Sequence, residues 1–399
     1  MINIQDKAKC CGCTACASIC PLNCIDMKKD FEGFFYPHVD TKKCNDCGLC
    51  QKICPIETPI STSKHQRDTF AVRSKDMDNV LKSTSGGFFI PMAAWMHEHD
   101  GVICAASYDA EFNVKHTFIE KSNVTVDRLS KTRGSKYVQS ELGDAFSKIK
   151  ELLKEDRLVC FVGTPCQVSG LKKYLRKNYE NLITVDLVCR GTPSPKLWKK
   201  YVDYQEKKHH SKIKTVSFRN KTYGYHNSTM NIVFENGKIY NGSARVDYML
   251  KSFMSELASR PSCYQCAFKS IERCSDLTIY DCWHFEELVP NAKDDNKGYT
   301  NVIVHSDKGK EILTQLQEKL WIYPVDTNTA VALDGIMINN CAKAHARRNE
   351  FYKDLDNRSL DAHIQEFIPI NVKNRLFERA KIVLYKLGLL NKLKKMRKK

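Results

Sequence analysis

Two cysteine runs with the same spacing constrain the N-terminal part of this chain more than any other feature. The runs are Cys10-x2-Cys13-x2-Cys16-x3-Cys20-Pro21 and Cys44-x2-Cys47-x2-Cys50-x3-Cys54-Pro55. Three closely spaced thiolates in a tight loop can hold three irons of a cubane, and in two-cluster ferredoxins the fourth cysteine of each run serves the other cluster. We therefore predict a small ferredoxin-like domain with two [4Fe–4S] clusters over residues 1–57.

The crossed pairing assigns four ligands to each cluster. One cluster takes Cys10, Cys13, Cys16 and Cys54, and the other takes Cys44, Cys47, Cys50 and Cys20. A pair of zinc knuckles is the alternative, but zinc usually takes its four ligands as two separated pairs. Tandem runs that each end in Cys-Pro favour clusters. Cys11 and Cys24 are left over and are interpreted as spare thiols near a cluster.

The number of cysteines also indicates a compartment. The chain has 19 cysteines, and ten of them lie between Cys10 and Cys54. Thiols stay reduced in the cytoplasm, where a cysteine-rich pattern more often means metal binding than disulfides. The start of the sequence has no apolar signal core, and no stretch reaches the ~18 uncharged apolar residues of a membrane helix. We therefore expect a cytoplasmic protein.

Beyond the cysteine runs, the sequence alternates between strand and helix patterns. Residues 58–68 are polar and are interpreted as a linker. Helices are predicted over 88–97, 144–154, 166–177 and 195–207, and strands over 102–107, 158–162, 183–188, 213–219, 230–234 and 277–281, followed by a strand–helix pair at 301–318. This mixture predicts an α+β fold with a mixed α/β domain over 69–335 and a helical tail over 336–399. The sheet order cannot be read from the sequence.

Five segments of this larger domain occur in an order shared with a known family. They are Ser83-Thr84-Ser85-Gly86-Gly87, Gly134-Ser135-Lys136-Tyr137, Phe161-Val162-Gly163-Thr164-Pro165-Cys166-Gln167, Asp186-Leu187-Val188-Cys189-Arg190-Gly191 and Cys263-x2-Cys266-x7-Cys274. With the cysteine runs in front, the chain resembles the coenzyme F-420 hydrogenase/dehydrogenase beta-subunit family over about residues 1–300, in the form found in bacterial surface-polysaccharide gene clusters. The resemblance implies FAD, [4Fe–4S] clusters and electron transfer to or from an organic substrate.

Several of these residues are candidates for holding the flavin. A glycine turn before a helix lets a phosphate approach free backbone N–H groups, and Ser85-Gly86-Gly87 and Gly163-Thr164-Pro165 both have this pattern. Lys136, between Ser135 and Tyr137, could stabilise a reduced, anionic flavin, with a solvated lysine as the equally weighted alternative. Cys166 begins the second of these helices, where its thiol could lie beside the flavin ring.

A third cluster and a proton donor are further candidates. Cys263, Cys266 and Cys274 supply three of the four ligands that a cluster needs, and the fourth is expected to be Cys189 rather than Cys166, with a zinc site as the alternative. Cys104, Cys160, Cys282 and Cys341 are expected to be buried small hydrophobes. Near Asp281 and Trp283, His284 stands where relatives tend to have glycine; it is a candidate proton donor, although a structural histidine is more common.

The positive charge is concentrated at the C-terminus. The net charge is +17, and residues 371–399 contain eleven Lys or Arg against the single acid Glu378, so this segment alone supplies +10. The surplus on the rest of the chain favours an acidic partner such as a ferredoxin, and no zinc-finger, RNP or helix-turn-helix signature indicates nucleic acid. Apolar residues alternating with Lys and Arg predict a basic amphipathic helix, which could rest on an anionic membrane or be solvated.

Together these features predict an iron–sulfur, flavin-dependent oxidoreductase that exchanges electrons with a ferredoxin-type partner and acts on a small-molecule or saccharide substrate. An electron-transfer subunit without a substrate of its own is the alternative, and a zinc-rich interaction protein is a third hypothesis.

Overall fold

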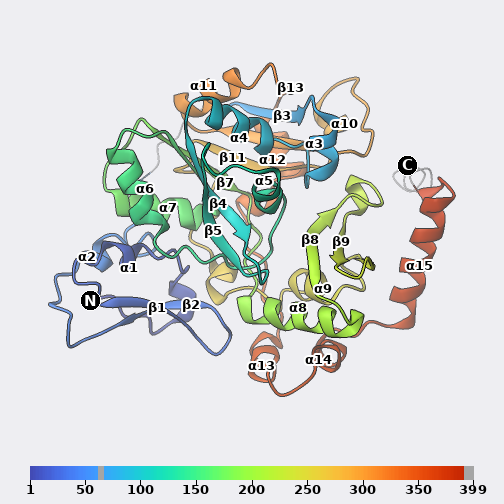
Figure 1. Cartoon of the computed structure of the whole chain (residues 1–399), viewed down its shortest axis with the longest axis horizontal. Coiled ribbons are helices and arrows are strands. Elements are labelled where there is room, and N and C mark those ends of the chain that lie inside the picture. Colours follow the sequence, from blue (N-terminus) through green and yellow to red (C-terminus); the bar gives the residue numbers. More distant parts are fainter. Residues whose placement is uncertain (62–66, 391–399) are drawn as a thin grey trace.

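An eight-stranded mixed sheet forms the centre of the molecule (Figure 1). The computed structural model describes residues 1–61 and 67–390. In the order β13-β3-β12-β11-β7-β6-β4-β5, the sheet contains β13 (Leu320–Val325), β3 (Thr69–Ser74), β12 (Tyr299–Val304), β11 (Leu277–Cys282), β7 (Leu182–Leu187), β6 (Val159–Gly163), β4 (Val102–Tyr108) and β5 (Val114–Ile119).

The four central strands β4, β6, β7 and β11 run parallel. Their sequences are nearly continuous apolar runs, as expected for parallel strands that are covered on both faces. Because the strands are parallel, their C-terminal ends meet along one side of the sheet, which we call the carboxyl edge. The neighbouring strand β12 is antiparallel to β11 and therefore begins at this edge. In open α/β sheets, ligands bind in the crevice outside this edge.

Helices cover both faces of the sheet. Helices α4 (Phe89–Glu98) and α11 (Asp307–Gln315) bury side chains such as Met92 on one face, together with the strand residues of that core. Helices α6 (Ala145–Lys154) and α7 (Pro165–Leu175) cover the other face. The core under α6 and α7 also contains Cys13, Ala15 and Ile53 of the N-terminal segment, which is thus joined to the central domain. Further helices are α3 (Met77–Lys82), α5 (Val126–Thr132), α10 (Phe285–Leu288) and α12 (Thr327–Leu333).

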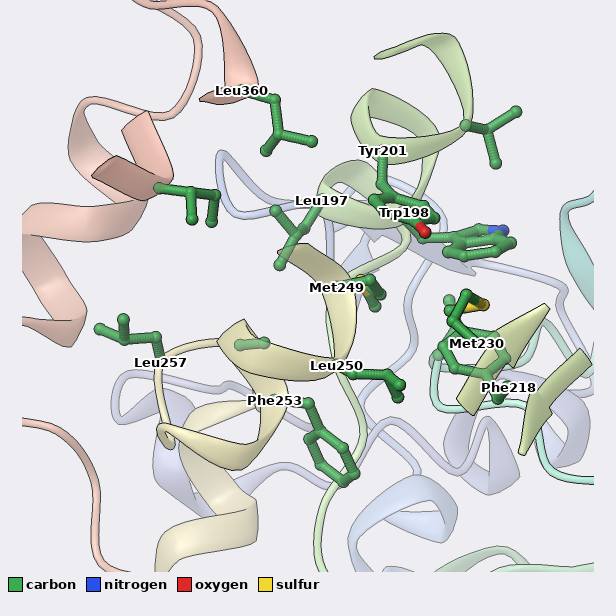
Figure 2. Close-up of a cluster of buried hydrophobic side chains, with 14 of the residues drawn as sticks. Leu197, Trp198, Tyr201, Phe218, Met230, Met249, Leu250, Phe253, Leu257 and Leu360 are labelled. Atoms are coloured by element: carbon green, nitrogen blue, oxygen red, sulfur yellow. The ribbon is translucent and has the colours of Figure 1, made fainter. Parts of the chain in front are cut away.

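A second, smaller sheet forms its own core (Figure 2). Its antiparallel strands are β8 (Ile213–Asn220), β9 (Thr229–Phe234) and β10 (Ile239–Gly242), and its helices are α8 (Pro195–His209), α9 (Tyr248–Met254), α13 (Arg348–Lys353) and α14 (Leu360–Phe367). Trp198 and Phe218 pack together in this core, and Phe351 and Leu360 of the C-terminal segment are buried with them. Helices α13 and α14 are therefore a structural part of the second core.

The N-terminal segment, residues 1–57, which we call the head, is a small two-fold repeat. It contains the hairpin β1 (Ile25–Lys29) and β2 (Phe35–Val39) and the short helices α1 (Ala15–Ile19) and α2 (Leu49–Lys52). The two cysteine runs have left-handed backbone at equivalent positions: φ is 71° at Gly12 and 54° at Asp46, and 63° at Thr14 and 71° at Gly48. The two runs therefore fold into the same loop.

The predicted α+β class is confirmed, and predicted elements such as the strand over 158–162 and the helix over 144–154 appear as β6 and α6. The linker predicted over 58–68 includes 62–66, which lie outside the described residues, as do 391–399 of the predicted basic helix. The described part of that helix is α15 (Val372–Lys386). Within the part of the chain that the structure describes, no helix is both long and apolar enough to cross a bilayer.

Candidate iron–sulfur and flavin site

The head cysteines line two separate cavities. Cys10, Cys13, Cys16 and Cys54 line the first cavity together with the spare thiol Cys11. Cys20, Cys44, Cys47 and Cys50 line the second cavity together with the spare thiol Cys24. Each cavity thus receives three cysteines from one run and the fourth from the other run. This is the crossed arrangement that the spacing predicts for two cubanes, although ligation itself stays a prediction.

The thiols of the first cavity are crowded and largely buried. Burial, with the neighbouring thiols of Cys10 and Cys54, raises the pKa of Cys16 to about 12. Such thiols are neutral unless a cation compensates their charge, because burial and like charges both disfavour the thiolate. A metal cluster provides that compensation, since metal binding displaces the thiol protons. The donor set of the first cavity therefore suits an iron–sulfur cluster.

A third group of cysteines lies in an open pocket of about 770 Å³ at the carboxyl edge. Cys166 lies in the first turn of α7, Cys189 follows β7, and Cys263 and Cys266 lie in and just after the 3-10 helix η3 (Pro261–Gln265). Burial raises the pKa of Cys189, and the nearby Cys263 and Cys166 add to the shift. Burial and the nearby Cys166 raise the pKa of Cys266 to about 12. Four thiols from three segments thus converge on one pocket.

Cys274, which the sequence predicts as a ligand of a third cluster, lies apart from this group. Its charged neighbours are Lys172, Asp186 and Arg273, and it packs beside the core under α6 and α7. The pocket instead brings together both of the candidates for the fourth position, Cys166 and Cys189.

The remaining body cysteines divide into three buried thiols and one exposed thiol. Cys104, Cys160 and Cys282 are buried, as expected. The expectation that Cys341 is buried is wrong: it is exposed, and its Sγ accepts a hydrogen bond from the Cys266 N–H at 3.2 Å.

The first cavity and the third pocket have a common wall. Lys9, Cys11 and Ile56 line both of them. Arg260, which is 1% exposed, contacts the first cysteine loop: its Nε donates to the Cys10 carbonyl at 2.7 Å, and its guanidinium lies 3.9 Å from the centre of the Tyr36 ring. The buried Nη2 of Arg260 has no hydrogen-bond partner among the described residues. A buried cation thus stands between the two cysteine groups.

Helix α7 contacts both cysteine groups. Its first turn carries Cys166, and one turn later Gly170 faces the first cavity. A Cβ placed on Gly170 would lie 2.7 Å from the Cys13 Cβ and 2.9 Å from its Sγ, closer than side-chain atoms approach. Glycine at this position therefore lets the first cysteine loop approach α7 directly.

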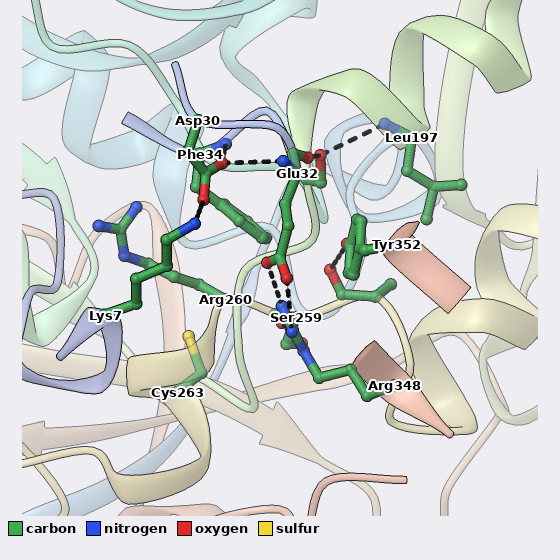
Figure 3. A network of polar contacts seen from close by, with 12 residues as sticks. Lys7, Asp30, Glu32, Phe34, Leu197, Ser259, Arg260, Cys263, Arg348 and Tyr352 are labelled. Carbon is green, nitrogen blue, oxygen red and sulfur yellow. Dashed lines mark hydrogen bonds and ion pairs between the residues drawn. The ribbon is translucent and has the colours of Figure 1, made fainter. Parts of the chain in front are cut away.

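Buried polar contacts also fix the head to the second core (Figure 3). The Glu32 carboxylate accepts two hydrogen bonds from the Arg348 guanidinium at 3.0 and 2.7 Å, and both side chains are buried. The Ser194 hydroxyl donates to the Glu32 carbonyl, and Lys196 Nζ donates to the Phe31 carbonyl at 2.7 Å. Because charged groups are rarely buried unless paired, these contacts specify one position of the head.

The residues predicted to cradle a flavin phosphate separate into two places. Ser85 Oγ lies 2.7 Å from Thr300 Oγ1, which also accepts from the Gly86 N–H at 2.9 Å. Gly87 has φ 81°, and the Ser135 N–H donates to Thr84 Oγ1 at 3.0 Å. This first group lies at the carboxyl edge where β12 begins, and these donors are already engaged by protein atoms.

Thr164 belongs to the cysteine pocket instead, and Gly163 directly precedes it at the end of β6. The Thr164 N–H donates to Gln167 Oε1 at 2.9 Å, closing a capping box at the start of α7. Thr164 Oγ1 lies 3.1 Å from Cys166 Sγ, and both residues line the third pocket. A Cβ on Gly163 would lie 2.9 Å from the Phe161 ring, so that local packing already requires this glycine.

Lys136 is a helix cap in this structure. Its Nζ donates to the carbonyls of Thr132, Arg133 and Gly134 at 3.0 to 3.3 Å, where α5 ends. Burial lowers the pKa of Lys136 to about 7. The neighbouring Tyr137 packs against Phe253 of the second core, with 4.9 Å between ring centres.

His284 follows β11 at the carboxyl edge and is held by a buried carboxylate. Its Nδ1 lies 2.7 Å from Asp334 Oδ1, and burial raises the pKa of Asp334. The neighbouring residues Asp281 and Trp283 meet a group that the motif analysis missed. Arg219 forms an ion pair with Asp281 and lies 4.6 Å from the Trp283 ring centre, and Tyr225 stacks on Trp283 at 4.2 Å.

Arg219 has an unsatisfied donor at this site. Its Nη2 is buried without a hydrogen-bond partner among the described residues. Nearby Lys221 Nζ donates to the Ser85 carbonyl at 2.5 Å, and burial lowers its pKa to about 7. The sequence signal was the run of cationic and aromatic residues over 219–226, which has no fixed motif.

Comparison with known proteins gives two family matches. Residues 9–58 match the 4Fe-4S dicluster domain, and residues 156–328 match the C terminus of the coenzyme F420 hydrogenase/dehydrogenase beta subunit. None of the curated proteins compared with the chain is similar to it. Among solved structures, a chain of the F420-reducing [NiFe] hydrogenase complex from Methanosarcina barkeri is similar with a TM-score of 0.42 and 16% identity, over 76% of this chain and 93% of that chain. That likeness is too weak to carry an argument. The two matches thus make the chain similar to the coenzyme F420 hydrogenase/dehydrogenase beta subunit over residues 156–328 and to a 4Fe-4S dicluster domain over residues 9–58.

Proposed function

We propose that the protein passes electrons between a ferredoxin-type partner and an organic substrate, using two [4Fe–4S] clusters in the head, a third at the carboxyl edge, and FAD. The observation that carries the proposal is the common wall of Lys9, Cys11 and Ile56, which places the first head cavity directly beside the third cysteine pocket. A head that only stored electrons would not need this contact.

The residues that would hold each cofactor are specific. The crossed sets of head cysteines hold two clusters, and Cys166, Cys189, Cys263 and Cys266 hold the third. FAD would lie at the carboxyl edge near Trp283, because the orphaned Nη2 of Arg219 beside an aromatic stack suits an anionic, planar ligand. When bound, the clusters would supply single-electron transfer, and FAD would exchange two electrons with the substrate.

The chain's own residues would control the surroundings of these groups. Arg260 places a fixed positive charge next to Cys10 and Cys263, and this charge favours the more negative, reduced state of a nearby cluster. His284, held by Asp334, is positioned to hold a proton at the carboxyl edge, where the substrate would bind.

The partner would dock at the second head cavity. Cys47 is exposed there, whereas Cys13 and Cys50 are buried. The positive surplus of the chain favours an acidic partner such as a ferredoxin.

Anaerobically purified protein with single cysteine substitutions tests the proposal. The parent protein should contain about twelve irons per chain and FAD. Cys166→Ala and Cys189→Ala should each lower the iron content by about four, whereas the matched control Cys274→Ala should keep all of it. Loss of iron from the Cys274 variant, with iron retained in the Cys166 variant, would overturn the assignment.

The flavin is tested separately. Arg219→Lys keeps a charge near Asp281 but loses the planar fork, so FAD content should fall while the iron content stays. Arg157→Lys, at the opposite edge of the sheet, is the control and should keep FAD. A parent protein with a full set of iron but no flavin would support the alternative, an electron-transfer subunit without a substrate of its own.

A further inference from the structure

The C-terminal helix α15 (Val372–Lys386) turns a polar face toward the body. Its only acid, Glu378, is buried, and the carboxylate accepts hydrogen bonds from the Ser243 N–H at 3.2 Å and the Ser243 hydroxyl at 2.5 Å. Lys381 lies over the Tyr223 ring at 4.7 Å, and Tyr385 packs edge-on against the same ring. These contacts fix which side of the helix faces the protein.

The opposite side of α15 is apolar and faces solvent. Val372, Leu376, Val383 and Leu387 are spaced by four, seven and four residues, which places them on one stripe of a helix. They are 71%, 58%, 54% and 64% exposed. Of the seventeen exposed large apolar side chains in the described residues, seven lie between Val372 and Leu389. Exposed patches of this kind mark interaction sites.

Positive charge borders this stripe without any exposed acid in the segment. Arg375, Arg379 and Lys386 are exposed, and Glu378 is the only acidic residue of the eleven-cation segment 371–399. Because that one carboxylate is turned inward, the outward surface of α15 presents apolar and cationic groups only. In Figure 1 this helix stands at the margin of the molecule, beside the second sheet.

We propose that this outward face of α15 binds an anionic membrane surface, with the helix lying in the plane of the interface. An apolar stripe flanked by Lys and Arg is the pattern of interfacial helices. A second copy of the chain is disfavoured as the occupant, because it would bring a second segment of net charge +10 against the first. A nucleic acid would pair with the cations and leave the apolar stripe in water. The proposal does not depend on the redox function.

Flotation of the full-length, cluster-loaded protein with vesicles tests this proposal. Vesicles containing phosphatidylglycerol should bind the protein, and vesicles of phosphatidylcholine alone should bind it at least tenfold more weakly. Leu376→Asp combined with Leu387→Asp should lower binding to anionic vesicles by tenfold or more. Each substitution removes apolar area that the membrane would otherwise bury. The matched control Ile336→Asp alters an equally exposed residue, 62%, outside this segment and should leave binding unchanged.

The readouts separate folding from binding. Iron content and the visible spectrum should be the same in all variants, because the substituted side chains make no buried contact. Raising the salt concentration should weaken binding of the parent protein, since screening reduces the attraction of Lys and Arg to anionic lipid. Full-length protein that ignores anionic vesicles, or leucine variants that bind as well as the parent, would refute the proposal. A dimer that the leucine substitutions dissociate would identify a second copy as the occupant instead.

Discussion

The two halves of the head share a cysteine spacing and a backbone shape, yet their surroundings differ. The first cavity faces the central domain, where Gly170 of α7 and the Arg260 guanidinium pack against its loop. In the second half, Cys47 is exposed, and among the described residues only the chain neighbours of Gly48 come within 4 Å of a Cβ placed on it. A repeated motif therefore sets the ligands, while the contacts around it set what each half can do.

The residues at equivalent positions of the two loops differ in the same way. Gly12 and Asp46 both have left-handed backbone, but a Cβ at Gly12 would overlap the Gln139 amide nitrogen and approach Arg260 Nη1 to 3.1 Å. Asp46 is exposed, and its carboxylate pairs with the Met1 amino group. Docking thus explains why the first loop needs glycine where the second carries a side chain.

The largest difference between the halves should appear when each loses one ligand. Cys13→Ala and Cys47→Ala should each remove about four irons per chain. Only Cys13→Ala should also stop the transfer of electrons from a head reduced by a small soluble reductant to the body. The reason is that only the first cavity adjoins the third pocket. Stopped-flow absorbance of the two variants measures this, and equal transfer in both would break the comparison.

Removing the buried anchor of the head should have the next largest effect. Arg348→Met leaves the Glu32 carboxylate buried without its partner, which should cost about 3–5 kcal/mol. The midpoint of urea unfolding should fall accordingly. The double variant Glu32→Leu with Arg348→Met should recover much of this loss, since no unpaired charge stays buried. A single variant as stable as the parent would show that the head is not fixed by this pair.

A matched pair of asparagine substitutions should show a smaller difference. Asparagine tolerates left-handed backbone, so Gly12→Asn and Asp46→Asn differ chiefly in what surrounds them. Gly12→Asn should displace the Gln139 side chain, which accepts from the Phe35 N–H, at a cost of about 1–3 kcal/mol. Asp46→Asn should leave the unfolding midpoint nearly unchanged. Equal effects in both would mean that docking does not explain the glycine.

The smallest expected effect concerns reduction potential. Arg260→Gln removes the buried charge beside Cys10, so the potential of the first cluster should fall, on the order of 50–100 mV. Arg260→Lys should restore part of the shift. The potential of the second cluster, which Arg260 does not contact, should stay the same. Redox titration followed by electron paramagnetic resonance separates the two, and a shift shared by both clusters would contradict a local effect.

The sequence predicted the grouping of the head cysteines because ligand spacing and the crossed pairing are local properties of the two runs. It predicted Cys189, Cys263 and Cys266 of the third group but not that Cys166 joins them, since Cys166 and Cys189 meet only because β6 and β7 are parallel neighbours, and strand order is not encoded in local pattern. Cys274 belongs to the same cysteine motif as Cys263 and Cys266, yet it lies beside Asp186 and not in their pocket. The edge strands β5 and β13 were also missed.

The C-terminal helix shows a related limit. The sequence predicted the spacing of its apolar residues and its positive charge, but not which side of the helix packs against the body. An amphipathic pattern usually predicts that the apolar face is buried. Here Glu378 and its bonds to Ser243 decide the opposite orientation, and those partners are 135 residues apart in sequence.

The pairing of Glu32 with Arg348 has a consequence for biosynthesis. These two residues are 316 positions apart, so at about 5–20 residues per second the ribosome needs about 15–60 s to deliver the arginine after the glutamate. During that interval the newly made head has no final anchor, and until Gly170 and Arg260 have been made its first cysteine loop is as open to the iron–sulfur assembly machinery as its second. The order of synthesis thus gives both loops equal access to iron before the finished fold makes them different.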